Sequence, residues 1–189
     1  MTIEQQMDEA RVPVEAQNGT LTEYDQSLRD YVVNVRDEEP GGINFVIANV
    51  CNADLSLTAS DARLMVWVMA KELILSNRRV MVMNASKLAS WLTKTDAWED
   101  DTFRPDFADH LVLNNFFREG QESPYTAAEL NKLIEYIGDR YDYGKTTHCV
   151  WDVNNADGIG RALRAWYPQL WSDWWFDENT TYQIKRTRR

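Results

Sequence analysis

The chain has 189 residues and a formal net charge of −10, with 30 acidic residues against 20 Lys and Arg. That length suits one domain with a sizeable core and a short appendage. Because no long apolar run is present and the first residues are polar and acidic, we expect no membrane anchor or signal peptide and a cytoplasmic protein. An acidic chain repels phosphate backbones, which disfavours general nucleic-acid binding, so its acids serve a basic protein partner or solubility alone.

Residues 1–40 carry ten acids against three Arg, a net charge of −7, with one modest amphipathic stretch at 22–33. We therefore predict an acidic N-terminal arm that is mobile or ordered by a partner. The sequence "DEEPGG" at 37–42 combines charge, Pro and a Gly pair, and it marks a break. We place the boundary there, with the acidic arm at 1–40 and one domain at 41–189.

After the break, apolar runs of strand length alternate with helical patterns. Strands are predicted at 43–50, 78–84, 110–115 and 147–154, with a last edge strand at 180–186. Helices are predicted at 60–77, 85–95, 123–141 and 156–167, the third with a capping box formed by Thr126 and Glu129. Apolar strands separated by helices indicate an α/β fold, a three-layer sandwich with a mainly parallel sheet. Ligands of such sheets bind at the carboxyl ends of the strands.

The loop after the first predicted strand lacks the residues that bind phosphate. A phosphate-binding loop needs glycines for its tight turns and a Lys that reaches the terminal phosphates. No Gly occurs from residue 43 to 119, and the first Lys of the chain is Lys71, well inside a predicted helix. We expect the segment "CNADLSLTAS" at 51–60 to fill the space instead, with Leu55 and Leu57 turned inward.

The third predicted strand, "HLVLNN", ends in two amides, Asn114 and Asn115. In nucleotide-hydrolysing α/β proteins such a strand ends in carboxylates, one holding Mg²⁺ while its neighbour polarises the attacking water. An Asn brings no negative charge to a metal and is no general base. An alternative interpretation is an unrelated α/β domain in which Asn114 and Asn115 begin a turn.

Four segments carry a family pattern: "AKELILSNRRVMVMNASKLASWL", "HLVLNNFF", "ELNKLIEYIGDRYDYGKTTHCVWDVN" and "IGRALRAWYPQL". In their order along the chain and in the residue pattern of each segment, they resemble the AAA+ helicase loaders of the bacterial DnaC type and their relatives that serve transposons. The resemblance covers roughly residues 43–189. The resemblance places "HLVLNNFF" at the Walker B strand. It also implies that Asn154 corresponds to the Asn with which the family senses the γ-phosphate. It also leaves Arg161 or Arg164 as the candidate for the arginine finger.

The resemblance implies a degenerate P-loop NTPase domain, because the phosphate loop, Walker A, is gone and both Walker B carboxylates are amides. Phosphoryl transfer depends on the charges of the Lys and of the metal-holding acids. Losing both should abolish hydrolysis. We therefore expect a pseudo-ATPase and no enzyme, with no cofactor, no metal site and no catalytic residue.

Two pairs of reactive side chains are expected to be structural. His110 and His148 lie at or near the starts of predicted strands, the end of the sheet away from any ligand. Cys51 and Cys149 are too few for a disulfide framework and lack the spacing of metal ligands. We expect small buried hydrophobes at both Cys positions.

Clusters of charge and of aromatic residues supply candidate contacts. The run 96–109 holds six acids against one Arg, and its first four are candidate partner-binding residues: Asp96, Glu99, Asp100 and Asp101. The segment 166–178 gathers six aromatic residues, some for the core and some as anchors for a partner: Trp171, Trp174 and Trp175. The tail supplies candidate nucleic-acid contacts, or is merely solvated: Lys185, Arg186, Arg188 and Arg189.

We expect a non-catalytic AAA+-like protein that binds a partner in DNA replication or mobile-element biology. The partner is a replicative helicase, a helicase loader or another AAA+ subunit, which the protein recruits or inhibits; it would fit a phage or plasmid product. The acidic arm and the 96–109 run would dock a basic surface. Two alternatives are a replication accessory protein that contacts nucleic acid, and an acidic DNA mimic that occupies the groove of a DNA-binding protein.

Overall fold

The computed structural model of the chain describes residues 2–18, 26–37, 42–48, 59–94, 105–118, 125–152 and 181–184. Its elements in chain order are α1 (Ile3–Glu9), α2 (Val14–Asn18), α3 (Gln26–Asp37), β1 (Gly42–Ala48), α4 (Ala59–Leu75), β2 (Val80–Asn84), α5 (Ala85–Leu92), the 3₁₀ helix η3 (Pro105–Phe107), β3 (His110–Arg118), α6 (Ala127–Asp142), β4 (Thr146–Asp152) and β5 (Thr181–Ile184). The five predicted strands and the predicted helices at 60–77, 85–95 and 123–141 are all present. The predicted helix at 156–167 lies outside the described residues.

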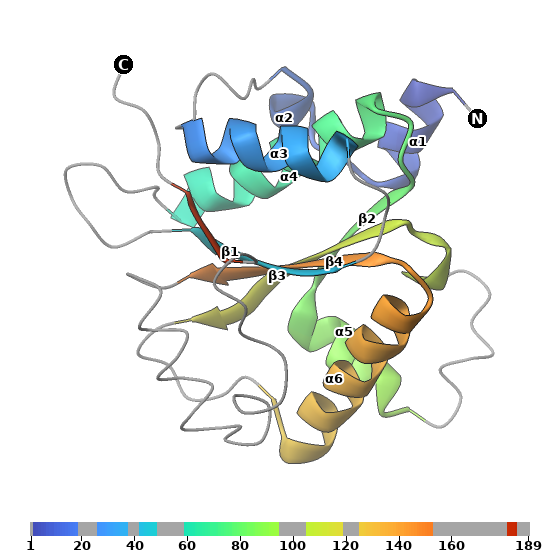
Figure 1. Ribbon diagram of the computed structural model, residues 1–189. Helices are drawn as coiled ribbons and strands as arrows, with labels where there is room; N and C mark the ends of the chain where they lie inside the picture. Colours follow the sequence, from blue (N-terminus) through green and yellow to red (C-terminus); the bar gives the residue numbers. More distant parts are fainter. Residues whose placement is uncertain are drawn as a thin grey trace.

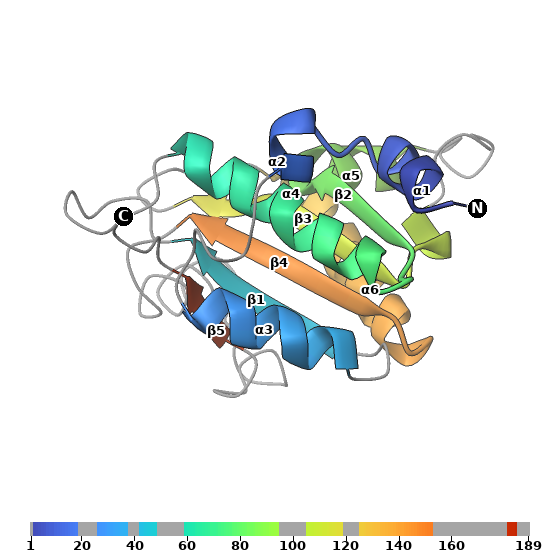
Figure 2. The same cartoon turned by 90° about the horizontal axis from the view of Figure 1, so that it is seen from above.

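The five strands form one sheet in the order β2-β3-β4-β1-β5, and all neighbours are parallel. Figure 2 shows β2 and β5 at the two edges of this sheet. Because the strands run the same way, their amino ends lie at one end of the sheet and their carboxyl ends at the other. The predicted α/β class with a parallel sheet is confirmed, and the strand predicted at 180–186 is an edge strand.

Helices lie against both faces of the sheet (Figure 1). The N-terminal helices and α4 lie on one face, and α5 and α6 lie on the other. α4 is apolar around most of its circumference because it lies between the sheet and the N-terminal helices. Six of its described residues are fully buried: Met65, Val66, Val68, Met69, Ala70 and Leu73. Among the helices described, none has both the length and the apolar character needed to cross a membrane.

Successive side chains of the central strands pack into two cores. Leu113 and Cys149 pack with α5 and α6, whereas Val112 and Val150 pack with α3 and α4. This division follows from the alternation of side chains along a strand. The Cys149 thiol is free and fully buried, and burial raises its pKa. The prediction of a small buried hydrophobe is confirmed for Cys149, while Cys51 lies outside the described residues.

The described parts of residues 1–40 pack on the domain and do not stand apart as an arm. They contribute six side chains to the core around α4: Ala10, Val12, Ala16, Tyr31, Val32 and Val35. The arm prediction is therefore wrong for these parts. The charged residues of a helix lie on its exposed face, so the net charge of a segment does not show whether the opposite face is buried. One apolar stripe is enough to pack a helix on the domain. In α3 that stripe is Tyr31, Val32 and Val35.

Local signals fix where α5 and α6 begin. Asn84, the last residue of β2, caps α5 by accepting hydrogen bonds from the backbone N–H groups of Ser86 at 3.0 Å and Lys87 at 3.2 Å. At α6 the Thr126 hydroxyl accepts from the Glu129 N–H at 3.2 Å, and the Glu129 carboxylate accepts from the Thr126 N–H at 2.9 Å. The predicted capping box is confirmed.

Candidate functional site

The carboxyl end of β3 is not the simple strand end that the sequence predicts. β3 continues past Asn114 and Asn115, and its pairing with β4 shifts register between Leu113 and Phe117. Between these two positions β3 advances by four residues while β4 advances by two, from 149 to 151. β3 therefore carries a bulge at the amides, a feature that re-aims side chains at the end of a strand.

Hydrogen bonds hold both sides of this bulge. Asn115 lies in the left-handed region at φ 53°, which Asn tolerates better than most residues. The Asn114 side-chain oxygen accepts from the Asn115 backbone N–H at 2.8 Å. Beyond the bulge, Phe116 is buried and its carbonyl accepts from the Tyr125 hydroxyl at 2.6 Å. The amide oxygen of Asn114 is thus used within the chain.

Neutral amides lie side by side at the carboxyl end of β2 and at the bulge of β3. Asn84 and Asn114 occupy one register position on the two strands, and the Asn84 oxygen caps α5. Within the described ranges, no group of three or more His, Cys, Asp or Glu is placed to hold a metal ion. These two positions offer hydrogen-bonding groups but neither a charged metal ligand nor a general base.

Most of the residues predicted for the site lie outside the described residues. Among the predicted nucleotide-site positions, these are Asn154, Arg161 and Arg164, together with the loop at 51–58 that holds Leu55 and Leu57. Among the predicted contact residues, these are Asp96, Glu99, Asp100, Asp101, Trp171, Trp174, Trp175, Lys185, Arg186, Arg188 and Arg189. Of the predicted site residues, the structure describes Asn114 and Asn115.

Two acids of the predicted docking run 96–109 are described, and both bind partners inside the domain. Asp106 accepts a hydrogen bond from the Tyr136 hydroxyl at 2.7 Å. Asp109 accepts two from the Arg79 guanidinium, at 2.8 and 3.1 Å. Burial acts to raise the pKa of Asp109, but the hydrogen bonds and charge of Arg79 hold it below its usual value. These two acids therefore have partners within the domain, and the docking role of the run stays a prediction.

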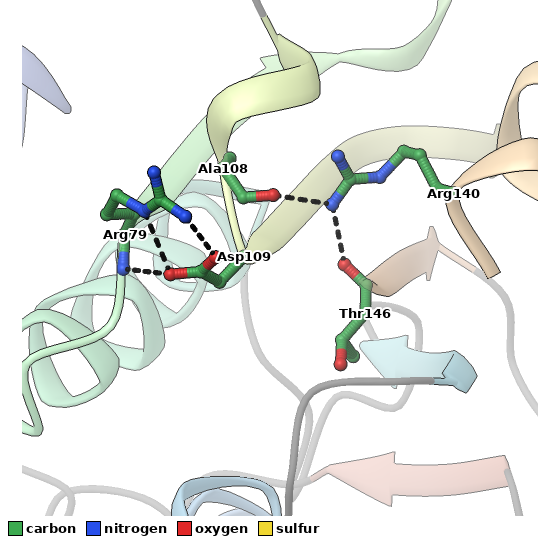
Figure 3. A network of polar contacts seen from close by, with 5 residues as sticks. All are labelled: Arg79, Ala108, Asp109, Arg140 and Thr146. Carbon is green, nitrogen blue, oxygen red and sulfur yellow. Dashed lines mark hydrogen bonds and ion pairs between the residues drawn. The ribbon is translucent and has the colours of Figure 1, made fainter. Parts of the chain in front are cut away.

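Arg140 links the amino ends of β3 and β4 (Figure 3). Its Nη2 donates to the carbonyls of Ala108 at 3.2 Å and Thr146 at 3.0 Å, and its Nε donates to the Thr147 hydroxyl at 3.1 Å. Arg140 is 2% exposed, and burial lowers its pKa. Together with the ion pair of Arg79 and Asp109, it connects the amino ends of β2, β3 and β4.

The sequence interpretation missed Arg140, although the sequence holds a signal for it. Arg140 follows Leu133, Tyr136 and Ile137 at positions i+7, i+4 and i+3 of one buried stripe on α6. A cation on such a stripe must find hydrogen-bond acceptors, because an unpaired buried charge is costly. Its acceptors are two backbone carbonyls and the Thr147 hydroxyl, and no sequence pattern marks this pairing.

His110 and His148 form a buried pair, as befits the structural role predicted for them. His110 Nδ1 lies 3.1 Å from His148 Nε2, and the two rings stack with an interplanar angle of 13°. The Tyr31 hydroxyl of α3 is hydrogen bonded to His148 Nδ1. Burial lowers the pKa of His110 to about 4 and that of His148 well below its ordinary value, so both are neutral near neutral pH.

Comparisons with known proteins give a structural match alone. No protein-family model matches the chain, and no curated protein matches it in sequence. Among solved structures, the chain is similar to AMPPCP-bound DnaA from Aquifex aeolicus, with a TM-score of 0.51 and 13% sequence identity. The match covers 83% of this chain and 49% of that one, so the chain spans about half the length of the solved DnaA chain. At this identity the likeness is one of fold: the chain has an α/β fold like that of the AAA+ ATPase DnaA.

Proposed function

We propose that this chain is a non-catalytic AAA+-like protein that binds a protein partner in DNA replication or mobile-element biology and recruits or inhibits it. The partner would be a replicative helicase, a helicase loader or another AAA+ subunit, as the resemblance to DnaC-type loaders implies. The observation that carries the proposal is the amide pair Asn114–Asn115 at the bulge of β3, in a parallel sheet like that of DnaA.

The likeness to DnaA supports the replication setting. The DnaA of that structure binds AMPPCP, an ATP analogue, so the neighbour combines this fold with a nucleotide. The present chain combines the fold with two amides at the bulge of the strand that the resemblance identifies as Walker B. A fold of this kind without charged groups at that position retains its surfaces for association with other proteins.

The chemistry of the described strand ends supports a non-catalytic role. Mg²⁺ bound to phosphates is held in such sites by carboxylate oxygens, and the attacking water needs a base or an orienting group. Asn114 brings no charge, and its oxygen accepts the Asn115 N–H. Residues 49–58 contain neither Gly nor Lys, so the sequence supplies no phosphate loop in compensation.

Two measurements on the full chain test the proposal. In titration calorimetry with ATP and Mg²⁺ we expect no heat of binding, and in a phosphate-release assay no hydrolysis. Affinity capture from a bacterial lysate, followed by mass spectrometry, should enrich a replicative helicase, a loader or another AAA+ protein. Tight ATP binding with hydrolysis would overturn the non-catalytic role, and consistent absence of those three protein classes would overturn the replication partner.

The matched variant Asn114→Asp/Asn115→Asp sharpens the nucleotide test. It places two carboxylates at the bulge of β3 but supplies no Gly-rich loop and no Lys. We expect it to remain inactive, because phosphoryl transfer requires the phosphate-binding loop and the metal site together. Hydrolysis by this variant would show that another part of the chain binds the phosphates.

A further inference from the structure

β2 is an edge strand, and its backbone is paired on one side. The Arg79 carbonyl, just before β2, accepts hydrogen bonds from the N–H groups of Asp109 and His110 at 2.8 and 3.0 Å, on the side of β3. In a parallel strand, alternate residues direct their backbone groups to opposite sides. The odd-numbered residues therefore face β3, and the N–H and C=O groups of Val80 and Val82 point away from it.

The outward side of β2 has no backbone partner in the described part of the chain. β2 pairs with β3 and with no other described strand, and no further backbone hydrogen bond there involves Val80 or Val82. Both residues are partly exposed. Natural edge strands are protected by shortness, a charge, a Pro, a bulge or a covering element. β2 is short, with five residues, but its sequence "VMVMN" contains no charged residue and no Pro.

The sequence that contains β2 is basic, in a chain of net charge −10. Residues 76–94 contain no Asp or Glu and four basic residues, of which Arg79 is paired with Asp109 from outside this stretch: Arg78, Arg79, Lys87 and Lys94. A second copy paired antiparallel through β2 would bring Arg78 of one copy near Lys87 of the other. Like charges at the ends of the pair disfavour that arrangement, while a strand with acidic ends is attracted.

We propose that the open edge of β2 binds an extended, apolar segment of a partner protein whose ends are acidic. The segment adds to the sheet as a further strand, held by the backbone groups of Val80 and Val82, and its acidic ends lie near Arg78 and Lys87. This inference rests on the proposed function in that the occupant belongs to a partner protein. It deepens that function by assigning the docking site to β2.

The substitution Val82→Pro tests the backbone contact directly. Proline removes the Val82 N–H, which points outward, and leaves the bonds from Met81 and Met83 to β3 in place. The matched control is Val82→Ala, which shortens the same side chain and keeps the N–H. Circular dichroism and thermal unfolding establish that both variants are folded, and Val80→Pro repeats the test at the second outward position.

The probe is a phage-displayed library of random short peptides, selected on the full wild-type chain. We expect selected peptides to alternate β-branched residues between acidic ends and to bind Val82→Pro about tenfold more weakly than wild type, with Val82→Ala close to wild type. In amide exchange, the Val80 and Val82 N–H groups should exchange fast in the free protein and slow down with peptide bound. No enriched peptide, or equal binding to folded Val82→Pro, would overturn the proposal.

Two further outcomes separate this inference from the proposed function. A helicase or loader captured equally by wild type and Val82→Pro would place the docking site elsewhere and leave the proposed function standing. No such capture by wild type, together with peptides that depend on Val82, would support the β2 site and overturn the replication partner. Concentration-dependent dimerisation that Val82→Pro abolishes would identify a second copy as the occupant and overturn the proposal.

Discussion

His110 and His148 share a hydrogen bond of 3.1 Å between Nδ1 and Nε2 inside the core, where neither side chain is exposed. Tyr31 extends this hydrogen-bond network by its bond to His148 Nδ1. In one consistent arrangement Tyr31 donates to His148 and His148 donates to His110, which requires both rings to be neutral. Protonation of the pair would turn the two facing nitrogens into two donors and break the bond.

The histidine pair predicts a loss of stability in acid. In the unfolded chain each His takes up a proton below about pH 6.5, whereas the folded chain resists protonation of His110 down to about pH 4. The unfolded state binds more protons in this window, so the free energy of unfolding falls as pH falls, by up to about 1.4 kcal/mol per pH unit for each His. Urea unfolding across a pH series measures this slope.

The variant His110→Gln/His148→Gln is the control for that slope, with His110→Asn as a milder second variant. Gln does not titrate in this window, so the contribution of the pair to the pH dependence disappears while that of the carboxylates stays. A slope in the folded double variant equal to that of wild type would contradict the prediction, whatever the absolute stabilities.

Removing the Tyr31 hydroxyl should destabilise the domain, because the hydrogen bond to His148 is lost. In Tyr31→Phe the ring still fills its buried position, but His148 Nδ1 loses its partner. We expect the free energy of unfolding to fall by about 1–3 kcal/mol. Tyr143 is 80% exposed, so Tyr143→Phe is the matched control and should change stability by less than about 0.5 kcal/mol. Equal effects of the two substitutions in chemical unfolding would disprove the role of Tyr31.

The three bonds of Arg140 predict a large effect at the amino end of the sheet. In Arg140→Met the aliphatic part of the side chain is retained, while Ala108, Thr146 and Thr147 lose a donor. We expect a loss of about 2–4 kcal/mol in the free energy of unfolding. Lys132→Met removes an exposed cation from the same helix, paired with Glu135 at 2.7 Å, and should cost less than about 1 kcal/mol. A loss for Arg140→Met no larger than for Lys132→Met would contradict this prediction.

The strands and the long helices of the domain can be predicted from the sequence because their causes are local. Apolar runs of strand length, the long apolar segment that forms α4 and the Thr126–Glu129 capping box all lie within single elements. The position at which α3 packs on the domain cannot be predicted in this way. Tyr31 bonds to His148, 117 positions along the chain, and the acidic composition of residues 1–40 conceals the stripe that carries it.

The same distinction between local and long-range causes explains which features of the candidate site can be predicted from the sequence. That two amides follow an apolar run is visible in "HLVLNN", and the structure places them at a bulge within β3. The bulge is not visible, because it is a mismatch of pairing between β3 and β4 and depends on residues far apart in sequence. Arg79 was missed for the same reason, since its partner Asp109 lies 30 positions away.

The left-handed backbone of Asn115 gives the sharpest test of the bulge. At φ 53° a side chain branched at Cβ clashes with its own backbone, whereas Gly does not. We expect Asn115→Val to lower the free energy of unfolding by about 1–2 kcal/mol and Asn115→Gly to leave it nearly unchanged. If Asn115 instead continued a regular strand, Val would be the better residue and Gly the worse one. The order of the two variants in urea unfolding therefore decides between a bulge and an extended strand at the amides.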